Sequence, residues 1–344
     1  MKILVYSDNH FCQYSSILRA RGNKYTKRLE NEIQSINFVE SEAQRLGCQQ
    51  VVCCGDFFDK PVLNAEELSA LNEIQWSPLP HIFLVGNHEM ASSNLEFNSV
   101  NALSRLGFTI VFNPSNQIDG DTEICYLPYQ LDSTEHKMQD YFAPEYKKRI
   151  IFSHNDIAGI QMGSFISTSG FDIKDIENSC DYFINGHIHN SAWISTSILD
   201  IGNLTGMNFS EDAFKYMHLY AVVDTDRLTV ETYNNPYAIR FGHIDDSIYN
   251  RFVSLKDENE LIVRNLVLSI KTDQSNVAEA RRIAEDLNLL AFKVTGVTTA
   301  VSGKKEEEVT FTSIDYLNKF IDFYKEKYGT SKLIDEELSK VTVE

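Results

Sequence analysis

Five short blocks of potential metal ligands lie within the first 190 residues, and each directly follows a short apolar run rich in β-forming residues. The blocks are Asp8 with His10, Asp56, Asn87 with His88, His154, and His187 with His189. The apolar runs that precede them are residues 2–7, 50–54, 81–85, 149–153 and 181–185. Such a run is typical of a buried strand that ends in a functional loop. We therefore expect five strands to deliver these side chains to one rim of a sheet.

The residue types fit a pair of divalent cations. Two cations roughly 3.5–4 Å apart can generate hydroxide and neutralise charge on the attacking and leaving oxygens of a phosphodiester, and such a pair needs a bridging carboxylate. Imidazole nitrogens with carboxylate and amide oxygens suit Mn²⁺, Fe²⁺ and Zn²⁺, and the six scattered cysteines form no thiolate cluster. The sequence thus predicts a two-metal phosphoesterase, with Mn²⁺ favoured and Fe²⁺ or Zn²⁺ as alternatives.

Glycine precedes the metal-type residue in three of the blocks, before Asp56, Asn87 and His187. Glycine lets the backbone turn sharply and approach closely where a Cβ would obstruct. We expect these glycines to serve the geometry of the site rather than its chemistry.

The five blocks together resemble the calcineurin-like metallophosphoesterases, whose pattern is Asp-x-His, Gly-Asp, Gly-Asn-His-Asp/Glu, His and Gly-His-x-His. Residues 55–59 read Gly-Asp-Phe-Phe-Asp, which is similar to the second block of SbcD-type DNA repair nucleases and of phage recombination nuclease subunits. Further likeness lies in Leu-Pro-Tyr at 127–129, Ile-Gly-Asn at 201–203 and Phe-Ser-Glu at 209–211. The resemblance covers roughly residues 1–235.

The resemblance implies a role for each residue of the blocks. One ion would be held by Asp8, His10, Asp56 and His189, and the other by Asp56, Asn87, His154 and His187. His88 resembles the family's non-ligand histidine, which stabilises the phosphoryl transition state or protonates the leaving oxygen. Asp59 would orient His88; the alternative for Asp59 is a solvated loop acid.

The first 240 residues are expected to form one layered α/β/β/α sandwich that carries the nuclease site. Residues 28–46 have helical spacing of apolar side chains, and Gly47 is a C-terminal stop. Strands and helices alternate to about residue 190, and strands are then predicted at 220–223 and 228–233. Pro236 and a polar stretch that follows it mark the boundary of this domain.

Two further segments are predicted after this boundary. Residues 250–311 read as a small α+β capping domain, with a strand at 261–271, a helix at 276–287 and a strand at 290–297. Residues 312–344 read as C-terminal helices with a narrow apolar seam formed by Ile314, Leu317, Ile321, Tyr324 and Tyr328. The seam either packs against the capping domain or docks another protein's coiled coil. SbcD-like nucleases use C-terminal helices to hold an SMC-like coiled-coil ATPase.

Net charge and hydropathy limit the classes of partner that this protein can have. The net charge of −18 is unusual for a protein that binds polyanionic DNA. Two basic clusters could contact a DNA backbone or could be solvated surface charge: Arg19, Arg21, Lys24, Lys27 and Arg28, and Lys147, Lys148 and Arg149. No apolar run approaches the roughly 18 residues of a membrane span, and the N-terminus enters a strand without a signal-like stretch. We therefore expect no membrane partner and a cytoplasmic protein, in a bacterium or in the host of a phage, with reduced core thiols.

The sequence and the resemblance together predict a metal-dependent DNA nuclease, the catalytic subunit of an SbcC/SbcD-like nuclease-ATPase complex in DNA recombination, repair or end processing. Its expected partners are DNA and the SMC-like ATPase, with a homodimer as another assembly. One alternative is a metallophosphoesterase that acts on nucleotides, cyclic nucleotides or phosphoproteins. A second alternative is a catalytically silent scaffold subunit, although a scaffold has no need to keep every metal donor.

Overall fold

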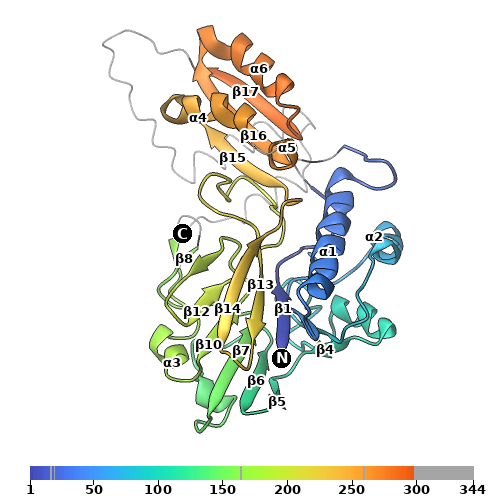
Figure 1. Ribbon diagram of the computed structural model, residues 1–344, viewed down its shortest axis with the longest axis vertical. Helices are drawn as coiled ribbons and strands as arrows, with labels where there is room; N and C mark the ends of the chain where they lie inside the picture. The colour runs from blue at the N-terminus through green and yellow to red at the C-terminus, as the bar shows by residue number, and fades with distance from the viewer. Residues whose placement is uncertain (16–17, 19, 163–164, 259, 298–344) are drawn as a thin grey trace, which may run out of the picture. The chain divides into compact units, whose positions relative to one another are not determined.

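The structure is a computed structural model that describes residues 1–15, 18, 20–162, 165–258 and 260–297 (Figure 1). The described residues belong to one compact unit, Met1–Thr298. The predicted C-terminal helices at 312–344, and the last residues of the predicted capping domain, lie outside the described residues.

The first of two large sheets has six strands in the order β14-β13-β1-β2-β3-β4. Strands β1 to β4 run parallel to one another, and β13 joins β1 antiparallel. Their bounds are β1 Lys2–Tyr6, β2 Gln50–Cys53, β3 His81–Leu84, β4 Thr109–Val111, β13 Leu219–Asp224 and β14 Thr229–Asn234. The strands predicted in these regions are confirmed.

The second sheet also has six strands, in the order β11-β12-β10-β7-β6-β5. Its central strands β6, β7, β10 and β12 are parallel, and β5 and β11 close the edges antiparallel. Their bounds are β5 Ser115–Asp119, β6 Thr122–Leu127, β7 Lys148–Ser153, β10 Tyr182–Asn185, β11 Ala192–Trp193 and β12 Ile198–Asp200. The predicted strands before His154 and His187 are thus β7 and β10.

The two sheets pack face to face through apolar side chains that alternate along their strands. Val5 and Leu84 of the first sheet meet Ile150 and Ile184 of the second in one buried cluster. Because successive side chains of a strand point to opposite faces, the remaining apolar positions face outward and need helices to cover them. The predicted α/β/β/α layering is confirmed.

Helices cover the outer face of each sheet. Helix α1, Lys27–Arg45, buries Leu29, Ile36 and Val39 against the first sheet, and Thr26 caps its first turn. Helix α2, Ala65–Ala70, begins with a capping box. Helix α3, Ile173–Glu177, lies on the second sheet. The remaining short elements of this region are η1 Leu71–Glu73, η2 Ser99–Leu106, η3 Met138–Asp140, β8 Gln161–Met162 and β9 Phe165–Ile166.

A smaller parallel sheet follows, in the order β15-β16-β17, with its own apolar cluster. Its elements are β15 Arg240–Ile244, η4 Asp246–Ile248, α4 Tyr249–Ser254, η5 Leu255–Asp257, α5 Glu260–Arg264, β16 Leu266–Asp273, η6 Gln274–Asn276, α6 Val277–Asp286 and β17 Ala291–Val297. The strand expected at 261–271 begins only at Leu266, because residues 260–264 form a helical turn instead. Local apolar content does not separate a buried strand from a buried helical turn over so few residues.

Two general properties follow from the described residues. None of the helices there is both long and apolar enough to span a bilayer. All six cysteines are buried and free, as the sequence predicts for core thiols.

Candidate metal centre

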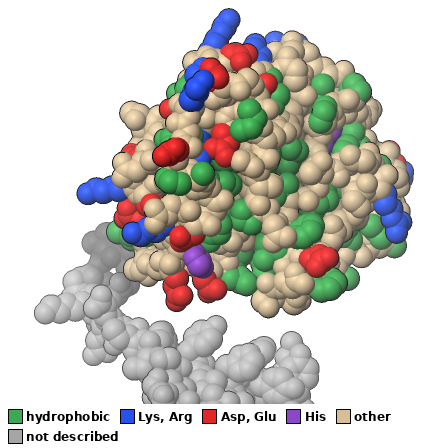
Figure 2. All heavy atoms as spheres, turned by 90° about the horizontal axis from the view of Figure 1, so that it is seen from below, with side chains coloured by type: hydrophobic (Ala, Val, Ile, Leu, Met, Phe, Trp, Pro, Cys, Tyr) green, Lys and Arg blue, Asp and Glu red, His purple; other side chains and the backbone are tan. Residues whose placement is uncertain are grey.

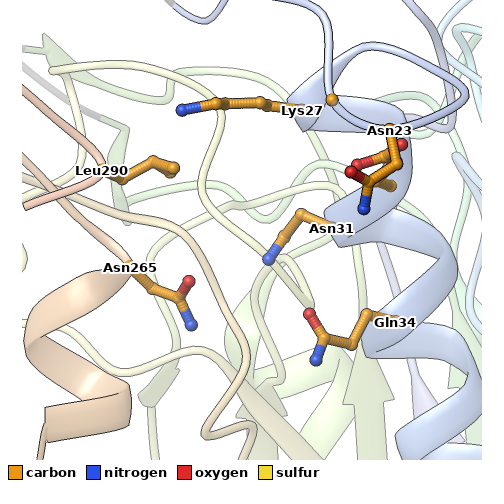
Figure 3. A pocket seen from close by; sticks show the side chains of 8 residues that line it. Asn23, Lys27, Asn31, Gln34, Asn265 and Leu290 are labelled. Carbon is orange, nitrogen blue, oxygen red and sulfur yellow. The ribbon is translucent and has the colours of Figure 1, made fainter.

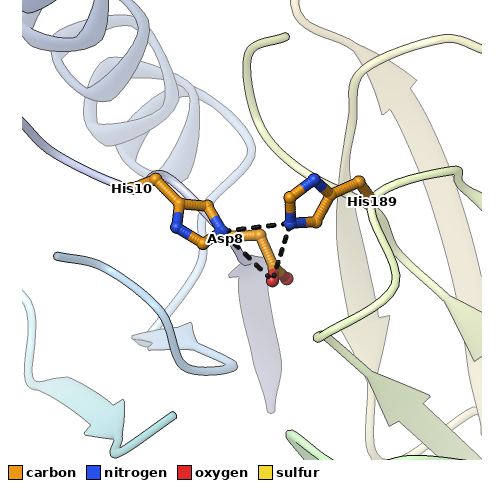
Figure 4. Close-up of side chains that lie close together, drawn as sticks. All are labelled: Asp8, His10 and His189. Carbon is orange, nitrogen blue, oxygen red and sulfur yellow. Dashed lines mark hydrogen bonds and ion pairs between the residues drawn. The ribbon is translucent and has the colours of Figure 1, made fainter. Parts of the chain in front are cut away.

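The five blocks converge at the carboxyl ends of five parallel strands, β1, β2 and β3 of one sheet and β7 and β10 of the other. One group of donors comprises Asp8, His10 and His189 (Figure 4). The Nε2 atoms of His10 and His189 are 3.1 Å apart, and each lies 3.9–4.0 Å from Oδ1 of Asp8. Three donors from two sheets therefore face one small space.

A second group comprises Asp56, His154 and His187, with Asn87 beside them. Nε2 of His154 lies 3.2 Å from Oδ2 of Asp56 and 3.2 Å from Oδ1 of Asn87, and Nδ1 of His187 lies 2.9 Å from the same amide oxygen. Oδ2 of Asp56 is also 3.9 Å from Nε2 of His10. The Asp56 carboxylate thus stands between the two groups, where a bridging ligand would be required.

Each of the four imidazoles in these groups has its outer nitrogen against a hydrogen-bond acceptor. The pairs are His10 Nδ1 with Asp59 Oδ1 at 3.2 Å, His154 Nδ1 with Cys54 O at 2.6 Å, His187 Nε2 with Asp156 Oδ1 at 3.0 Å, and His189 Nδ1 with Glu211 Oε1 at 3.5 Å. This pattern is the usual one for metal-binding histidines, because the acceptor fixes the tautomer and aims the inner nitrogen at the ion. The donor set and its support therefore fit two divalent cations.

The sequence did not single out Asp156, and it gave Glu211 no role. Asp156 follows His154 by two residues, yet its carboxylate pairs with His187 on the next strand. Glu211 lies more than twenty residues after His189 in the chain and also accepts from Asn203 Nδ2 at 2.9 Å. A local pattern could not reveal these pairings; the Phe-Ser-Glu likeness at 209–211 was the only signal.

The backbone at the centre adopts conformations that ordinary residues rarely occupy. The φ angles of Asp8, His10, Asp56 and His187 are +50°, +48°, +46° and +77°. A non-glycine residue in such a region costs on the order of 1–3 kcal/mol, and such residues cluster at functional sites. Four of the seven predicted ligands therefore carry strain that the surrounding fold must offset.

The glycines of the blocks act through close approach. A Cβ on Gly86 would overlap the Asp56 carboxylate, and one on Gly55, whose φ is +93°, would overlap the His154 ring. Glu89, which ends the third block, is fully buried and accepts from the backbone N–H of Phe58 at 2.9 Å and of Gly86 at 2.8 Å. Glu89 thereby fastens the loop of the second block to that of the third.

His88 lies at the open side of the centre. Its side chain is 43% exposed, whereas His10 and His154 are completely buried. Nδ1 of His88 donates to the backbone carbonyl of Asp59 at 3.1 Å. The Asp59 carboxylate lies closer to His10, at 3.2 Å, than to His88, at 3.8 Å. The structure therefore brings Asp59 to both rings, and the contact that orients His88 comes mainly from the Asp59 carbonyl. His88 also lies near enough to His10 and Asp56 to share an ion with them.

The electrostatics favour positive charge between the carboxylates. Burial would raise the pKa of Asp56, but the imidazoles of His154, His10 and His88 outweigh it and hold this pKa well below its usual range. Burial would conversely lower the pKa of His154, yet the charges of Asp56 and Asp8 raise it to about 10. A buried carboxylate that stays ionised and stabilises positive charge on neighbouring rings is also suited to hold a metal cation.

Known proteins were compared with this chain by sequence and by structure. Residues 1–191 match the sequence profile described as calcineurin-like phosphoesterase. No curated protein is significantly similar to the chain in sequence. Among solved structures, a Thermus thermophilus protein has 10% identity, covers 68% of this chain and 98% of its own, and gives a TM-score of 0.41.

Two further solved structures have similar coverage. A dimetal phosphatase from Danio rerio has 12% identity over 68% of this chain and 99% of its own, with a TM-score of 0.39. The calcineurin-like phosphoesterase YfkN from Bacillus subtilis has 11% identity over 68% of this chain and 88% of its own, with a TM-score of 0.36.

Proposed function

The chain belongs to the calcineurin-like phosphoesterase family, and from this premise we propose that it is a metal-dependent DNA nuclease, the catalytic subunit of an SbcC/SbcD-like nuclease-ATPase complex. The observation that carries the hydrolytic part is the convergence of seven nitrogen and oxygen donors around the shared carboxylate of Asp56. Members of this family use a centre of two metal ions.

The donors divide into two sets that share one residue. Asp8, His10, Asp56 and His189 would hold one ion, and Asp56, Asn87, His154 and His187 the other. Two such ions lower the pKa of water and offset the negative charge of a phosphodiester. Nitrogen and oxygen donors without thiolates favour Mn²⁺, with Fe²⁺ or Zn²⁺ as alternatives.

His88 is the residue of the centre best placed to meet a substrate. Its Nδ1 is held by the Asp59 carbonyl, so Nε2 is the ring atom that can face a phosphate. Its exposed position lets it donate a hydrogen bond to a phosphoryl oxygen or a proton to the leaving oxygen. Asp59 holds His10 and His88 in their mutual arrangement.

The DNA substrate rests on the likeness of residues 55–59 to SbcD-type nucleases. Both phenylalanines of that segment are fully buried and pack with Phe11, so they shape the loop rather than contact a substrate. The small unit around β15, β16 and β17 follows the sandwich in the chain, and we propose that it is the capping domain that SbcD-like nucleases carry at this point of the sequence. We propose boundaries near residues 240 and 312 for the nuclease and capping domains.

Most described residues of the two basic clusters are paired with acidic side chains, which leaves them little free positive charge for a DNA backbone; Arg19 lies outside the described residues. Arg21 pairs with Glu66, Lys24 with Glu73, buried Arg28 with Glu32, Lys147 with Asp121, and buried Arg149 with Glu123. Lys27 instead points into a hollow of about 330 Å³ beside α1, which is otherwise lined mainly by amide side chains (Figure 3). On the face drawn in Figure 2, Lys and Arg side chains are interspersed with Asp and Glu.

The pairing of basic residues with acidic side chains favours a second candidate function. Because the basic clusters are largely neutralised and the net charge is −18, a phosphoesterase that acts on nucleotides, cyclic nucleotides or phosphoproteins needs no further source of positive charge. The nuclease function requires that a partner contribute DNA-binding charge. We propose that the apolar seam of residues 312–344 holds an SMC-like coiled-coil ATPase that does so.

An activity screen of the full-length protein in Mn²⁺ separates the candidates. The substrates are single-stranded DNA, duplex DNA ends and bis-p-nitrophenyl phosphate, and Asp56→Asn serves as the matched blank. The nuclease function predicts cleavage of DNA and of the small diester, both lost in Asp56→Asn. Hydrolysis of the small diester without DNA cleavage, even with the ATPase present, would support the second candidate. No hydrolysis of any substrate would support a silent scaffold.

A further inference from the structure

A hollow of about 210 Å³ is lined in part by Tyr129, whose ring lies beside the rings of His154 and His187. Four rings line it, those of Phe112, Tyr129, His136 and Tyr141, and Gln130 and Asp132 add polar groups. Ligand pockets that enclose a whole drug-sized molecule have about 300–1,000 Å³, so this hollow suits one fragment of a larger substrate.

Tyr129 forms the contact between the hollow and the centre. Its ring centroid lies 5.8 Å from that of His187 and 6.5 Å from that of His154. Tyr129 is therefore close enough to the centre to contact a group that adjoins a phosphate bound there.

The loop that carries Tyr129 is fastened to the ligand loops by its backbone. The N–H of Tyr129 donates to the carbonyl of Val85 at 3.0 Å, two residues before Asn87. The N–H of Gln130 donates to Oδ1 of Asn155 at 2.8 Å, directly after His154. The hollow is therefore held at a fixed position relative to the centre.

The chemistry of the lining favours a flat, uncharged occupant. The described residues that line the hollow include no Lys or Arg, and Asp132 would repel a second phosphate or an acidic peptide. Aromatic faces bind bases by stacking with little regard to sequence, and amide and carboxylate groups can meet the polar edge of a base. His136 is already in edge contact with Tyr141, with ring centroids 5.8 Å apart.

We propose that this hollow is a nucleobase subsite, which receives the base of a nucleotide that flanks the scissile phosphate. The inference rests on the proposed nuclease function and deepens it. Stacking on the rings of the hollow places the adjoining phosphate at the two donor groups around Asp56. Substrate recognition thus depends on one unpaired base rather than on contacts with a charged backbone, which agrees with the paired state of the basic clusters.

The test uses the full-length protein in Mn²⁺ and short single-stranded oligonucleotides that contain one cleavable phosphodiester among nuclease-resistant linkages. Two further substrates carry an abasic sugar on one side or the other of that bond. For the unmodified protein, loss of the base on one side should lower kcat/KM by on the order of tenfold, the scale of one base stacked on an aromatic side chain. Equal kcat/KM for all three substrates overturns the subsite.

Variants of the residues that line the hollow test whether its rings cause the preference for an intact base. His136→Ala and Phe112→Leu should reduce the intact-to-abasic ratio of kcat/KM towards one, and this ratio does not depend on the fraction of folded enzyme. His136 is 48% exposed, so its replacement leaves the core packed. Tyr233→Leu, on β14 against Tyr220, is the matched control and should keep the ratio unchanged. An unchanged ratio in both variants of the hollow contradicts the proposal.

The same experiment distinguishes failure of the subsite from failure of the nuclease function. If every oligonucleotide is cleaved but the base makes no difference, the nuclease function stands and the subsite fails. If no oligonucleotide is cleaved while bis-p-nitrophenyl phosphate is hydrolysed, the nuclease function itself fails, and the subsite fails with it.

Discussion

At the scale of single residues, the centre separates side chains that would bind an ion from those that aim the ligands. Asp8, Asp56 and His154 are buried with their donor atoms converging, whereas Asp156 and Glu211 lie against the outer nitrogens of His187 and His189. Replacing a residue that binds an ion should therefore affect metal binding and catalysis differently from replacing a residue that aims a ligand.

His88→Ala should slow hydrolysis by roughly two to four orders of magnitude, the usual scale for a lost general acid or oxyanion donor. His88 is exposed and lies at the edge of the donor groups, so metal content should persist. Steady-state kinetics combined with elemental analysis of the purified variant would measure both. Loss of an ion from the variant would instead place His88 among the ligands.

Asp156→Asn should weaken Mn²⁺ binding by about 10–100-fold, because a neutral amide holds the outer nitrogen of His187 less firmly than a carboxylate does. Titration of the metal-depleted protein with Mn²⁺ would measure the change. Asp121→Asn is a suitable control, since Asp121 is exposed and pairs with Lys147 at the surface. Equal Mn²⁺ affinity in Asp156→Asn and the unmodified protein would show that the contact does not support the site.

At the scale of elements, a tight loop follows each strand that ends at the metal centre. The ligand in that loop lies in contact with another of these loops. The loops after β2 and β3 are joined by Glu89, and Gly86 lets the backbone of one loop touch Asp56 of the other. Ligand geometry therefore depends on loop contacts as much as on the ligands themselves.

Gly86→Ala should lower kcat by about 100-fold, since its Cβ would displace the Asp56 carboxylate and a misplacement of about 1 Å can cost that much. Gly107→Ala is the matched control: Gly107 has a φ of +84° but open space around it, so only stability should fall, by about 1 kcal/mol. Kinetics and thermal denaturation of both variants would compare the two effects. Comparable kcat values in the two variants would contradict the packing role of Gly86.

At the scale of the whole molecule, the centre joins the two sheets of the sandwich. Asp8, His10 and Asp56 come from loops of the first sheet, and His154, His187 and His189 come from loops of the second. Ions held between these loops would link the two layers in addition to the apolar interface. Metal binding should therefore contribute to global stability.

Removal of metal by a chelator should lower Tm. Mn²⁺ at 100 times its Kd adds about 2.7 kcal/mol to the folded state, which corresponds to a shift of about 4 °C for a chain of this size. Differential scanning calorimetry with and without Mn²⁺ would measure the shift. The Asp56→Asn protein should respond much less, and a Tm that is insensitive to Mn²⁺ in the unmodified protein would contradict a bridging centre.

Truncation before residue 312 should leave hydrolysis of a small diester intact, because every predicted ligand lies before residue 190. The same truncation should abolish co-purification with a coiled-coil ATPase if the apolar seam is an interaction surface. Leu317→Glu should weaken that interaction while the chain stays folded. If the truncated chain loses both cooperative unfolding and diester hydrolysis, the tail is internal packing instead.

The sequence by itself determined the strands that precede the five blocks, and the layered fold; the assignment of the blocks as metal ligands stays a prediction. These features follow from local patterns: apolar runs define β1, β2, β3, β7 and β10, helical spacing defines α1, and parallel strand ends meet at one rim. The likeness to SbcD-type nucleases supplied a substrate and a partner, and both remain predictions. Local composition failed over residues 260–264, where a helical turn precedes the expected strand.

Only the tertiary structure decided which side chains support the ligands and which charges remain free. The pairing of His187 with Asp156, of His189 with Glu211 and of Arg21 with Glu66 depends on which separate segments of the chain meet. The same is true of the aromatic hollow beside Tyr129, whose walls come from several segments of the chain. No periodicity in the sequence encodes these distances, because they are set by the packing of two sheets and the loops between their strands.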